Sequence, residues 1–537
     1  MHKIRIRCNA IHENIRIRSQ CVNSDYSVVT VTWVTRFAQR LGVQSMTSPT
    51  SAADAFLGQD PVPFYVDGQW TTGKHGNTIE VLRPSTGKLL ATISSGDADD
   101  IDNAVRAARQ AFPSWAARST RDRVVLLHRW ADAIEKHQDT LATIESRDIG
   151  KPLAEALEFD VLFSAEGIRY FADVADHVDP RELVAVRGIE AEQRFLPRGV
   201  CGFIIPWNAP GSLMVWGTAP ALAGGNTVVV KAPELAPMSC LFLCKLAEEV
   251  GIPAGVINVV PGFGETAGAA LAGHPDIDYI SFTGSPRTGM QVAIAAAGNF
   301  VPSKMELGGK GAAIVMPDVD VAATAEKLSL AVVRNAGQTC CTATRWLVQE
   351  SIYDEFVDAA INKLTSVHMG ADDDPNTVLG ALISNGQRKR VEHYLQRGQD
   401  TGATALLDGG PTAVQGLEGG FFVSPVLLTG DTTNVCAQEE IFGPVAYVMP
   451  FKNDDDAIAI ANDSRYGLAN SVWSQDLPHA RAVAAQLHAG NSWINAHNVF
   501  AYGLPYGGIG MSGWGGGVNS VKTYLDYLRP LTIARPL

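Results

Sequence analysis

The chain has 537 residues, of which 46% are hydrophobic and 18% charged, and it carries a formal net charge of −13. This is typical of a globular protein of about three domains, and the negative charge argues against nucleic-acid binding through phosphate contacts. The eight cysteines include no Cys-x-x-Cys pair, which indicates neither a zinc site nor a disulfide framework, and no apolar run is long enough to span a bilayer. We therefore expect a soluble cytoplasmic protein without a metal and without nucleic-acid or membrane partners.

Residues 1–60 differ in composition from the rest of the chain. Residues 1–45 contain seven lysines and arginines but only two acids, Glu13 and Asp25. Two interpretations stay open: an arginine-rich targeting segment, or upstream sequence translated before a true start at Met46. The second is favoured because residues 1–45 show neither a clear amphipathic helix nor a small-residue cleavage site. In both cases residues 1–60 are predicted to be a disordered extension without chemistry.

From Pro61 onward, helical and strand-like segments alternate. Apolar residues at spacings of three and four predict amphipathic helices at residues 100–116 and 121–134. Further on, strands are predicted at residues 200–205, 227–230, 256–260 and 279–282, and helices at residues 213–222 and 239–250. Strands that alternate with helices in this way predict a doubly wound parallel sheet, which binds ligands at the carboxyl ends of its strands.

Polar and glycine residues follow three of these strands. Lys231 and Glu234 come directly after one strand, where a ribose would lie, although a solvated Lys–Glu pair has the same spacing. A carboxylate there accepts hydrogen bonds from ribose hydroxyls and repels a 2′-phosphate, which favours NAD over NADP. Gly284 and Ser285 open a helix whose free N–H groups could hold a pyrophosphate. The pattern Gly262-x-Gly264 is equally typical of a tight turn.

A second chemical pattern lies further along the chain. Cys340 stands in a run of small residues, 34 residues after Glu306, a lone carboxylate among apolar and glycine neighbours. A thiol held near a carboxylate is what covalent attack on a carbonyl carbon followed by hydrolysis requires. A single cysteine is more often a small buried hydrophobic residue, so this pair alone leaves both interpretations open.

Taken together, these motifs resemble the aldehyde dehydrogenase superfamily over essentially Pro61 to Leu537. The spacing from Glu306 to Cys340 matches the family, and so does the 23-residue step from Asn208 to Lys231. Further matching motifs are Phe64–Gly68, Glu440–Val445, Leu504–Gly508 and Ser512-Gly513. The resemblance implies oxidation of an aldehyde to its carboxylic acid with NAD, and it favours Cys340 as a nucleophile.

The resemblance implies roles for individual residues. Cys340 adds to the aldehyde carbon, and the Asn208 amide with the Cys340 backbone N–H forms the oxyanion hole. After hydride transfer, Glu306 activates the water that hydrolyses the thioester. Cys341 is expected to pack in the interior, because only one sulfur can occupy the attack position.

The resemblance also implies the cofactor-binding positions. Those expected to bind NAD are Ile204, Pro206, Trp207, Lys231, Glu234, Gly264, Gly268, Phe282, Gly284, Ser285, Leu307, Glu440 and Phe442. Among them, Glu440 and Phe442 are expected to hold the nicotinamide ribose and ring. Lys231, Glu234 and the Gly284-Ser285 pair take the adenosine and pyrophosphate roles.

The substrate side is less defined by the sequence. By position in the family pattern, the residues expected to line the aldehyde tunnel are Leu213, Trp216, Phe500 and Tyr506. Such an aromatic lining predicts an apolar substrate, either an aromatic or a medium-chain aldehyde. Arg334, His497 and Asn498 lie nearby in the pattern and could bind a carboxylate or a hydroxyl. For Arg334, a surface or interface ion pair is the favoured interpretation.

The sequence departs from the family pattern near its end. Many relatives carry an Arg-Glu pair after the Ser-Gly motif, and the Glu has been suggested to relay protons. Here Ser512-Gly513 is followed by Trp514–Gly517, and Gly517 stands where that Glu would fall. The sequence therefore predicts no relay through this point, so that protons leave by water or by Glu306 alone.

The resemblance implies three structural parts: a doubly wound parallel NAD-binding domain, an α/β catalytic domain and a small β oligomerisation element. The predicted boundaries are 61–180 and 198–307 for the NAD-binding domain, 308–512 for the catalytic domain, and 181–197 and 513–537 for the oligomerisation element. The stretches Leu183–Phe195 and Tyr524–Leu537 alternate like strands, and unpaired strand edges invite pairing between subunits. A homodimer or homotetramer is expected.

Two other functions remain as alternatives. A CoA-acylating dehydrogenase of the same superfamily needs no water-activating base, and such relatives often lack a Glu at the position of Glu306. A non-catalytic structural member would be expected to lose Cys340, Asn208 or Glu306. All three residues are present, which favours the hydrolytic enzyme over both alternatives.

Overall fold

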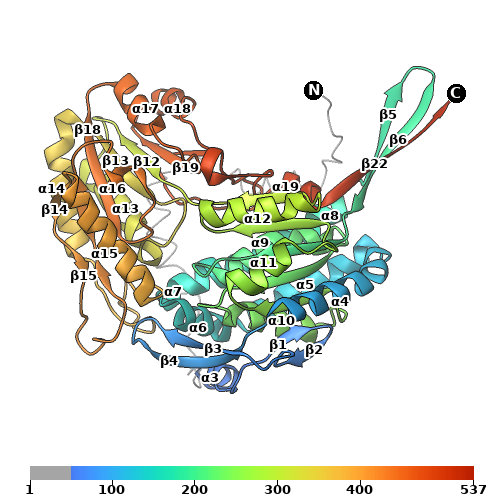
Figure 1. The fold of residues 1–537 in the computed structure, drawn as a ribbon. Coiled ribbons are helices and arrows are strands. Elements are labelled where there is room, and N and C mark those ends of the chain that lie inside the picture. Colours follow the sequence, from blue (N-terminus) through green and yellow to red (C-terminus); the bar gives the residue numbers. More distant parts are fainter. Residues whose placement is uncertain (1–49) are drawn as a thin grey trace.

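The computed structural model describes residues 50–537 (Figure 1), so the basic segment 1–45 lies outside the described residues. Residues 50–57 belong to the predicted disordered extension, but they form helix α3 (Thr50–Leu57). This part of the prediction is wrong because Ala53, Phe56 and Leu57 share one helix face and are buried, with Phe56 packed edge-on against Phe242. Among the described helices, none is long and apolar enough to cross a membrane.

An eight-stranded sheet forms the core of the first half of the chain. Its strand order is β2-β1-β9-β8-β7-β10-β11-β21, with the five strands from β9 to β11 parallel and the outer strands antiparallel. The strands are β1 (Phe64–Val66), β2 (Gln69–Thr71), β7 (Val200–Ile204), β8 (Thr227–Ala232), β9 (Ile257–Pro261), β10 (Tyr279–Thr283), β11 (Ser303–Glu306) and β21 (Gly513–Trp514). Strands β7, β8 and β9 are buried at every position, as expected for a sheet covered on both faces.

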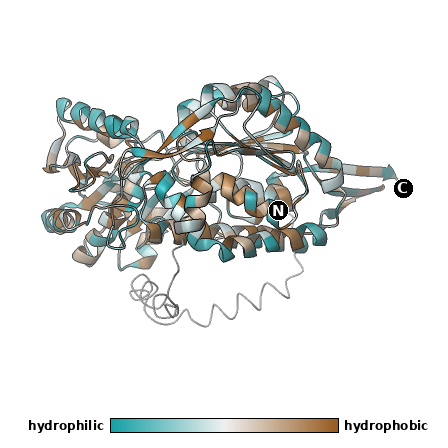
Figure 2. Cartoon of the chain, turned by 90° about the horizontal axis from the view of Figure 1, so that it is seen from below, coloured by the Kyte–Doolittle hydropathy of each residue, from teal (hydrophilic) through white to brown (hydrophobic). Residues whose placement is uncertain are grey.

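Helices cover both faces of this sheet, and many of them carry hydrophilic and hydrophobic residues together (Figure 2). They are α4 (Ala98–Ala116), α5 (Thr120–Lys136), α6 (Gln138–Ile149), α7 (Leu153–Glu155), the π-helical η1 (Ala156–Leu162), α8 (Phe163–His177), α9 (Pro210–Ala223), α10 (Met238–Glu249), η2 (Gly264–Gly268), α11 (Ala269–Ala272) and α12 (Pro286–Gly298). A hairpin of β3 (Thr78–Arg83) and β4 (Lys88–Ser94) lies beside them. The helix predicted at residues 213–222 begins earlier, because Pro210 fits the first helical turn.

A seven-stranded sheet forms the core of the second half, with strand order β14-β17-β18-β13-β12-β19-β20 and only β14 antiparallel. The strands are β12 (Gly311–Val315), β13 (Ala343–Gln349), β14 (Thr404–Leu407), β17 (Val426–Thr429), β18 (Val445–Phe451), β19 (Ala469–Trp473) and β20 (Asn491–Ile494). The other elements here are α13 (Val321–Val333), η3 (Arg334–Gly337), η4 (Glu350–Ile352), α14 (Tyr353–Thr365), α15 (Asn385–Asp400), β15 (Gly410–Pro411), β16 (Val423–Ser424), α16 (Val435–Gln438), α17 (Asp454–Asn462), α18 (Leu477–Ala484) and η5 (Gly510–Ser512). Two α/β units thus lie side by side (Figure 1), which confirms the predicted fold class.

A third, three-stranded antiparallel sheet projects from the molecule (Figure 1). Its order is β22 (Leu528–Pro536), β6 (Ile189–Pro197) and β5 (Arg181–Val186), so β5 and β22 are its edges. The predicted strand stretch beginning at Tyr524 was too long, since Tyr524 lies in helix α19 (Val521–Asp526) and is buried against the first core. The projecting strands leave apolar side chains in solvent, and Leu183 is 75% exposed.

Candidate active site

Cys340 lies in the loop between η3 and β13, at the boundary between the two α/β units. Three consecutive residues before it, Asn335, Ala336 and Gly337, have left-handed backbone with φ of 47°, 53° and 73°. Such backbone is costly for the two residues that carry a Cβ, and strain of this kind gathers at functional sites. A side chain at Gly337 would meet the carbonyl oxygen of Gly443, so this tight turn fixes the path of the chain into Cys340.

Two neighbouring side chains, Cys341 and Tyr506, influence the pKa of the Cys340 thiol. The neighbouring Cys341 thiol and, to a smaller extent, the Tyr506 hydroxyl lower the pKa of Cys340 below its usual value, although burial acts in the opposite direction. The Tyr506 hydroxyl oxygen lies 3.6 Å from the Cys340 sulfur. Cys341 itself is fully buried and donates to the side chain of Asn498 at 3.2 Å, so it packs in the interior. A lowered pKa makes Cys340 the more reactive of the two thiols.

Glu306 is the last residue of β11, at the carboxyl end of the first sheet, and is only 6% exposed. Its Oε2 atom makes no hydrogen bond to any of residues 50–537. Burial raises the pKa of Glu306 to about 8; Lys304 lowers it, and the charges of Cys340 and Asp526 raise it further. A buried carboxyl group with a free oxygen and a pKa near neutrality is suited to accept a proton from water.

Asn208 follows β7 and is buried next to the Cys340 loop. Its side-chain Nδ2 donates to the carbonyl oxygen of Gln338 at 3.0 Å, and its own carbonyl accepts from Asn335 Nδ2 at 2.8 Å. These bonds tie the strand end to the loop two residues before Cys340. Because an amide nitrogen carries two protons, the bond to Gln338 leaves the second proton of Asn208 Nδ2 unused.

An aromatic cluster borders Cys340, and it contains three of the four predicted tunnel residues. The Phe500 ring lies 5.9 Å from Trp216 and 5.1 Å from Tyr506, centroid to centroid. Leu213, the fourth, packs at the edge of the same cluster. Sequence reasoning missed further members of this cluster, which are Phe159, Phe163, Trp493 and Tyr502.

The polar residues near the predicted tunnel have partners within the protein. Arg334 Nε lies 3.4 Å from Glu155 Oε1, and its guanidinium lies over the ring of Phe159 at 4.7 Å, so the ion-pair interpretation is the one that the structure matches. His497 lies 2.7 Å from the carbonyl oxygen of Cys341, and burial lowers its pKa to about 4. Asn498 accepts from the Cys341 thiol. His497 is therefore neutral at neutral pH.

Most predicted adenosine-side residues lie along the carboxyl ends of β7, β8, β9 and β10. Lys231 is buried at the end of β8, with Nζ 3.0 Å from Glu234 Oε2, and Ile204 pairs with Lys231 in the neighbouring strand. Gly264 and Gly268 begin and end η2, which follows β9 directly. The remaining three adjoin α12: Phe282 is buried in β10, Gly284 follows that strand, and Ser285 caps the helix.

The predicted nicotinamide-side residues meet between the two sheets. The Trp207 and Phe442 rings pack edge to face at 5.4 Å, and the backbone N–H of Gly309 donates to Glu440 Oε1 at 2.9 Å. Burial raises the pKa of Glu440 to about 7. Of the two remaining predicted positions, Leu307 is buried against Gly289, and Pro206 is half-buried after β7.

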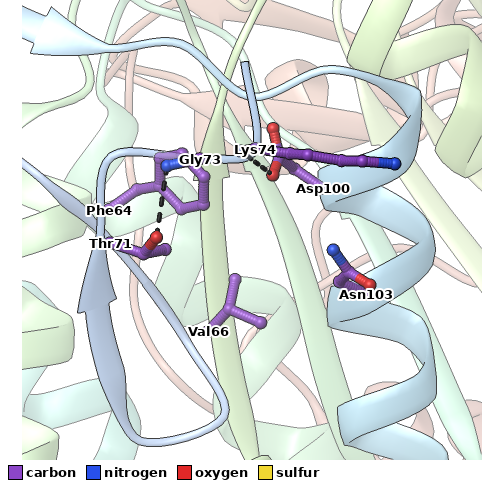
Figure 3. Close-up of a pocket in the computed structure, with 7 residues that line it drawn as sticks. All are labelled: Phe64, Val66, Thr71, Gly73, Lys74, Asp100 and Asn103. Carbon is purple, nitrogen blue, oxygen red and sulfur yellow. Dashed lines mark hydrogen bonds between the residues drawn. The ribbon is translucent and has the colours of Figure 1, made fainter. Parts of the chain in front are cut away.

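A separate pocket lies at the β1–β2 edge of the first sheet (Figure 3). It is lined by Phe64, Val66, Thr71, Gly73, Lys74, Asp100 and Asn103. The backbone N–H of Lys74 donates to Asp100, that of Gly73 donates to Thr71, and the Lys74 ammonium pairs with Asp99. None of the predicted site residues lines this pocket, and its polar groups are already paired within the protein.

Known proteins resemble this chain over most of its length. A family model described as the aldehyde dehydrogenase family matches residues 70–533. The human mitochondrial aldehyde dehydrogenase is 37% identical over 89% of this chain and 94% of its own length. The solved NAD⁺ complex of an aldehyde dehydrogenase from Bacillus cereus is 36% identical, with a TM-score of 0.88 over 91% of this chain and 99% of that one. PnpE from Pseudomonas sp. WBC-3, solved with nicotinamide adenine dinucleotide, is 37% identical, with a TM-score of 0.86 over 89% of this chain and 98% of that one. The chain belongs to the aldehyde dehydrogenase family.

Proposed function

We propose that the protein oxidises an aldehyde to its carboxylic acid with NAD, through a thiohemiacetal and a thioester on Cys340. One observation carries the proposal: the Cys340 thiol, with its lowered pKa, follows the loop that Asn208 Nδ2 contacts at Gln338, and its charge acts on the buried carboxyl group of Glu306. These three residues can supply a nucleophile, an oxyanion donor and a base, which is the set of groups that acyl chemistry on a thiol requires.

The first step is the addition of the Cys340 thiolate to the carbonyl carbon of the aldehyde. The new C–S bond pushes the carbonyl electrons onto oxygen, and that oxyanion needs donors close to the sulfur. We propose that the second proton of Asn208 Nδ2 and the Cys340 backbone N–H supply them. One such donor is typically worth about 10²- to 10³-fold in rate.

The residues at the strand ends fit NAD by their chemistry. When bound, NAD would supply the hydride acceptor that allows the Cys340 adduct to be oxidised to a thioester. Lys231 and Glu234 offer a cation and a carboxylate for the adenine-side ribose, and the amino end of α12 behind Ser285 offers backbone N–H groups for phosphate. The residues that would hold the nicotinamide end are Trp207 and Phe442, whose rings are in contact, and Glu440, which accepts from the Gly309 N–H.

Glu306 then acts as the base in thioester hydrolysis. Its free Oε2 atom accepts the proton of a water molecule while the water oxygen attacks the thioester carbon, and the Cys340 sulfur leaves as thiolate. A CoA-acylating enzyme would not need a buried base at this position, so the environment of Glu306 favours the hydrolytic reaction. The retention of all three catalytic side chains in one constellation argues against a non-catalytic member.

The aromatic cluster supports an apolar substrate, aromatic or of medium chain length. Trp216, Phe500 and Phe159 present ring edges and faces next to Cys340, and such surfaces bind flat or extended hydrocarbon groups. The cation near this cluster, Arg334, is already held by Glu155 and Phe159. This favours a neutral aldehyde over one with a terminal carboxylate.

We also propose that the protein is a homodimer or homotetramer whose subunits associate through the projecting sheet. Strand β5 and strand β22 are open edges, and their side chains Leu183 and Ile533 are 75% and 46% exposed. Open edges with apolar side chains are the usual sites of strand pairing between chains.

Incubation of the protein with NAD and a panel of aldehydes, with and without CoA, tests the proposed function. We expect one NADH and one carboxylic acid for each aldehyde consumed, at the same rate whether or not CoA is present. Acyl-CoA as the product would favour the acylating alternative. No NADH with any aldehyde of the panel would contradict the proposal.

A further inference from the structure

A buried lysine lies next to Glu306 on the same strand. Lys304 and Glu306 are two residues apart in β11, so their side chains point to the same face of the sheet. The side chain of Lys304 is 0% exposed, and its ammonium donates to the carbonyl oxygen of Gly517 at 2.6 Å and pairs with Asp526 Oδ2 at 3.0 Å. A buried charge with two such partners is costly to desolvate and needs a reason to be kept.

The glycine run after Gly513 is what makes room for this lysine. Gly515, Gly516 and Gly517 have φ of 101°, 102° and 73°, which residues with a Cβ rarely adopt. A Cβ at Gly515 would lie 2.8 Å from Lys304 Cα, and one at Gly516 would meet the carboxylate of Asp526. The glycine run Gly515–Gly517, which departs from the family pattern, therefore packs closely against Lys304.

Charged and titratable groups from several elements face this pair. From α19 come Asp526 and Lys522, and next to α19 the Tyr527 ring lies 5.3 Å from the Lys304 ammonium. Glu306 also interacts electrostatically with Cys340, with Tyr506 and with Tyr279 of β10. Of these groups, Lys304 carries the positive charge that stabilises ionised Glu306, whereas Cys340 and Asp526 oppose ionisation.

We propose that Lys304, held by Asp526 and the Gly517 carbonyl, is a positioning residue that stabilises the ionised form of Glu306 and so maintains thioester hydrolysis near neutral pH. The inference rests on the proposed function. It also revises the expectation that Glu306 works alone. Gly517 stands where many relatives carry the suggested relay Glu, and its carbonyl oxygen accepts a hydrogen bond from Lys304.

The test measures hydrolysis of the acyl-enzyme without NAD. p-Nitrophenyl acetate acylates the reactive cysteine directly, with p-nitrophenolate as the leaving group, and mass spectrometry then follows loss of the acetyl group from Cys340 between about pH 6 and about pH 10. The variants are Lys304→Met, which removes the charge, and Lys304→Gln, which keeps a donor for the Gly517 carbonyl if the first variant fails to fold. Lys522→Met is the matched control, since it removes an exposed lysine from the same neighbourhood.

We expect hydrolysis in wild type to rise with pH as Glu306 ionises. Loss of a nearby positive charge raises the pKa of a carboxyl group by about one unit or more. Both Lys304 variants should therefore shift the midpoint of the pH dependence of hydrolysis to higher pH by about one unit or more. Below that midpoint, hydrolysis should be about tenfold slower than in wild type, while acylation of Cys340 persists. Lys522→Met should keep the wild-type midpoint, because solvent screens its charge.

Two results would overturn the inference. One is an unchanged midpoint in the Lys304 variants, with rates lowered equally at every pH, which is what a purely structural lysine would give. The other is an equal shift in Lys522→Met. If wild-type Cys340 is not acylated at all, the proposed function itself fails, so the two failures are distinguishable.

Discussion

At the scale of single residues, the adjacent Cys340 and Cys341 have different roles in the site. Cys340 has a lowered pKa and faces the aromatic cluster, whereas Cys341 is fully buried with its pKa raised chiefly by burial. The sequence predicted Cys341 as a packing residue, and its burial agrees. The structure adds a contribution that the sequence does not show, because the Cys341 thiol is the largest cause of the lowered pKa of Cys340.

Substitution of the two cysteines separates these roles. Cys340→Ala should abolish aldehyde oxidation while NAD affinity, measured by calorimetry, stays close to wild type. Cys341→Ala should keep most activity, but it raises the pKa of Cys340, so the rise of iodoacetamide inactivation with pH should move to higher pH. If the two variants exchange phenotypes, the assignment of the nucleophile is off by one residue.

Glu234 is predicted to determine the choice of cofactor. Its side chain is partly exposed at the end of β8 and pairs with Lys231, where its charge would oppose a 2′-phosphate. We expect kcat/KM to be higher with NAD than with NADP in wild type, and Glu234→Gln should lower the ratio of the two kcat/KM values. Glu249→Gln, an exposed acid on α10, serves as the control. A wild-type preference for NADP would contradict the placement of Glu234.

At the scale of elements, strand ends were the most predictable part of the site. Lys231 was predicted from a buried apolar run followed by a polar residue, whereas Glu306 was singled out as a lone carboxylate before Cys340 and Asn208 by the family resemblance. In the structure, Lys231 and Glu306 lie at the carboxyl ends of β8 and β11, and Asn208 follows β7 in the same sheet. Phe159 and Phe163 were not predicted, because they come from η1 and α8, far from any strand end, and only tertiary packing brings them to Cys340. The local signal available in the sequence was their spacing of four residues. In the structure, the two rings stack 5.5 Å apart.

Lys304 shows a second limit of the sequence. Its position two residues before Glu306 was visible, but its burial depends on Gly517 and Asp526, more than 200 residues away in the chain. A strand-end lysine is normally solvated, so the local pattern gives no reason to expect a buried one.

The aromatic elements can be tested through substrate choice. Phe159→Leu keeps an apolar side chain but removes the edge-to-face contact with Phe500 at 5.3 Å. If the Phe159 ring also contacts an aromatic substrate, a ring pair worth about 0.5–1.5 kcal/mol is lost, so KM for an aromatic aldehyde should rise several-fold. Acetaldehyde, which has no ring to pack against Phe159, is the internal control. A similar loss for both aldehydes would indicate general damage to the site.

At the scale of the whole molecule, the projecting sheet is expected to control assembly. Leu183→Lys on β5 and Ile533→Lys on β22 place charges on its two open edges, and light scattering after size exclusion should then show smaller assemblies. Leu89→Lys, on the 55% exposed Leu89 of the β3–β4 hairpin, is the matched control and should leave the mass unchanged. An unchanged mass in both edge variants would place the subunit contact elsewhere.

The most direct test of the account is rapid mixing of Glu306→Gln with NAD and a good aldehyde. Glutamine keeps the size and hydrogen bonding of Glu306 but cannot take the proton of the attacking water, whereas attack and hydride transfer do not require that base. We expect a burst of NADH that approaches one per active site, followed by slow turnover, with the acyl group found on Cys340 by mass spectrometry. Loss of the burst itself would mean that Glu306 acts before hydride transfer, as in activation of the thiol, and would contradict its role as the hydrolytic base.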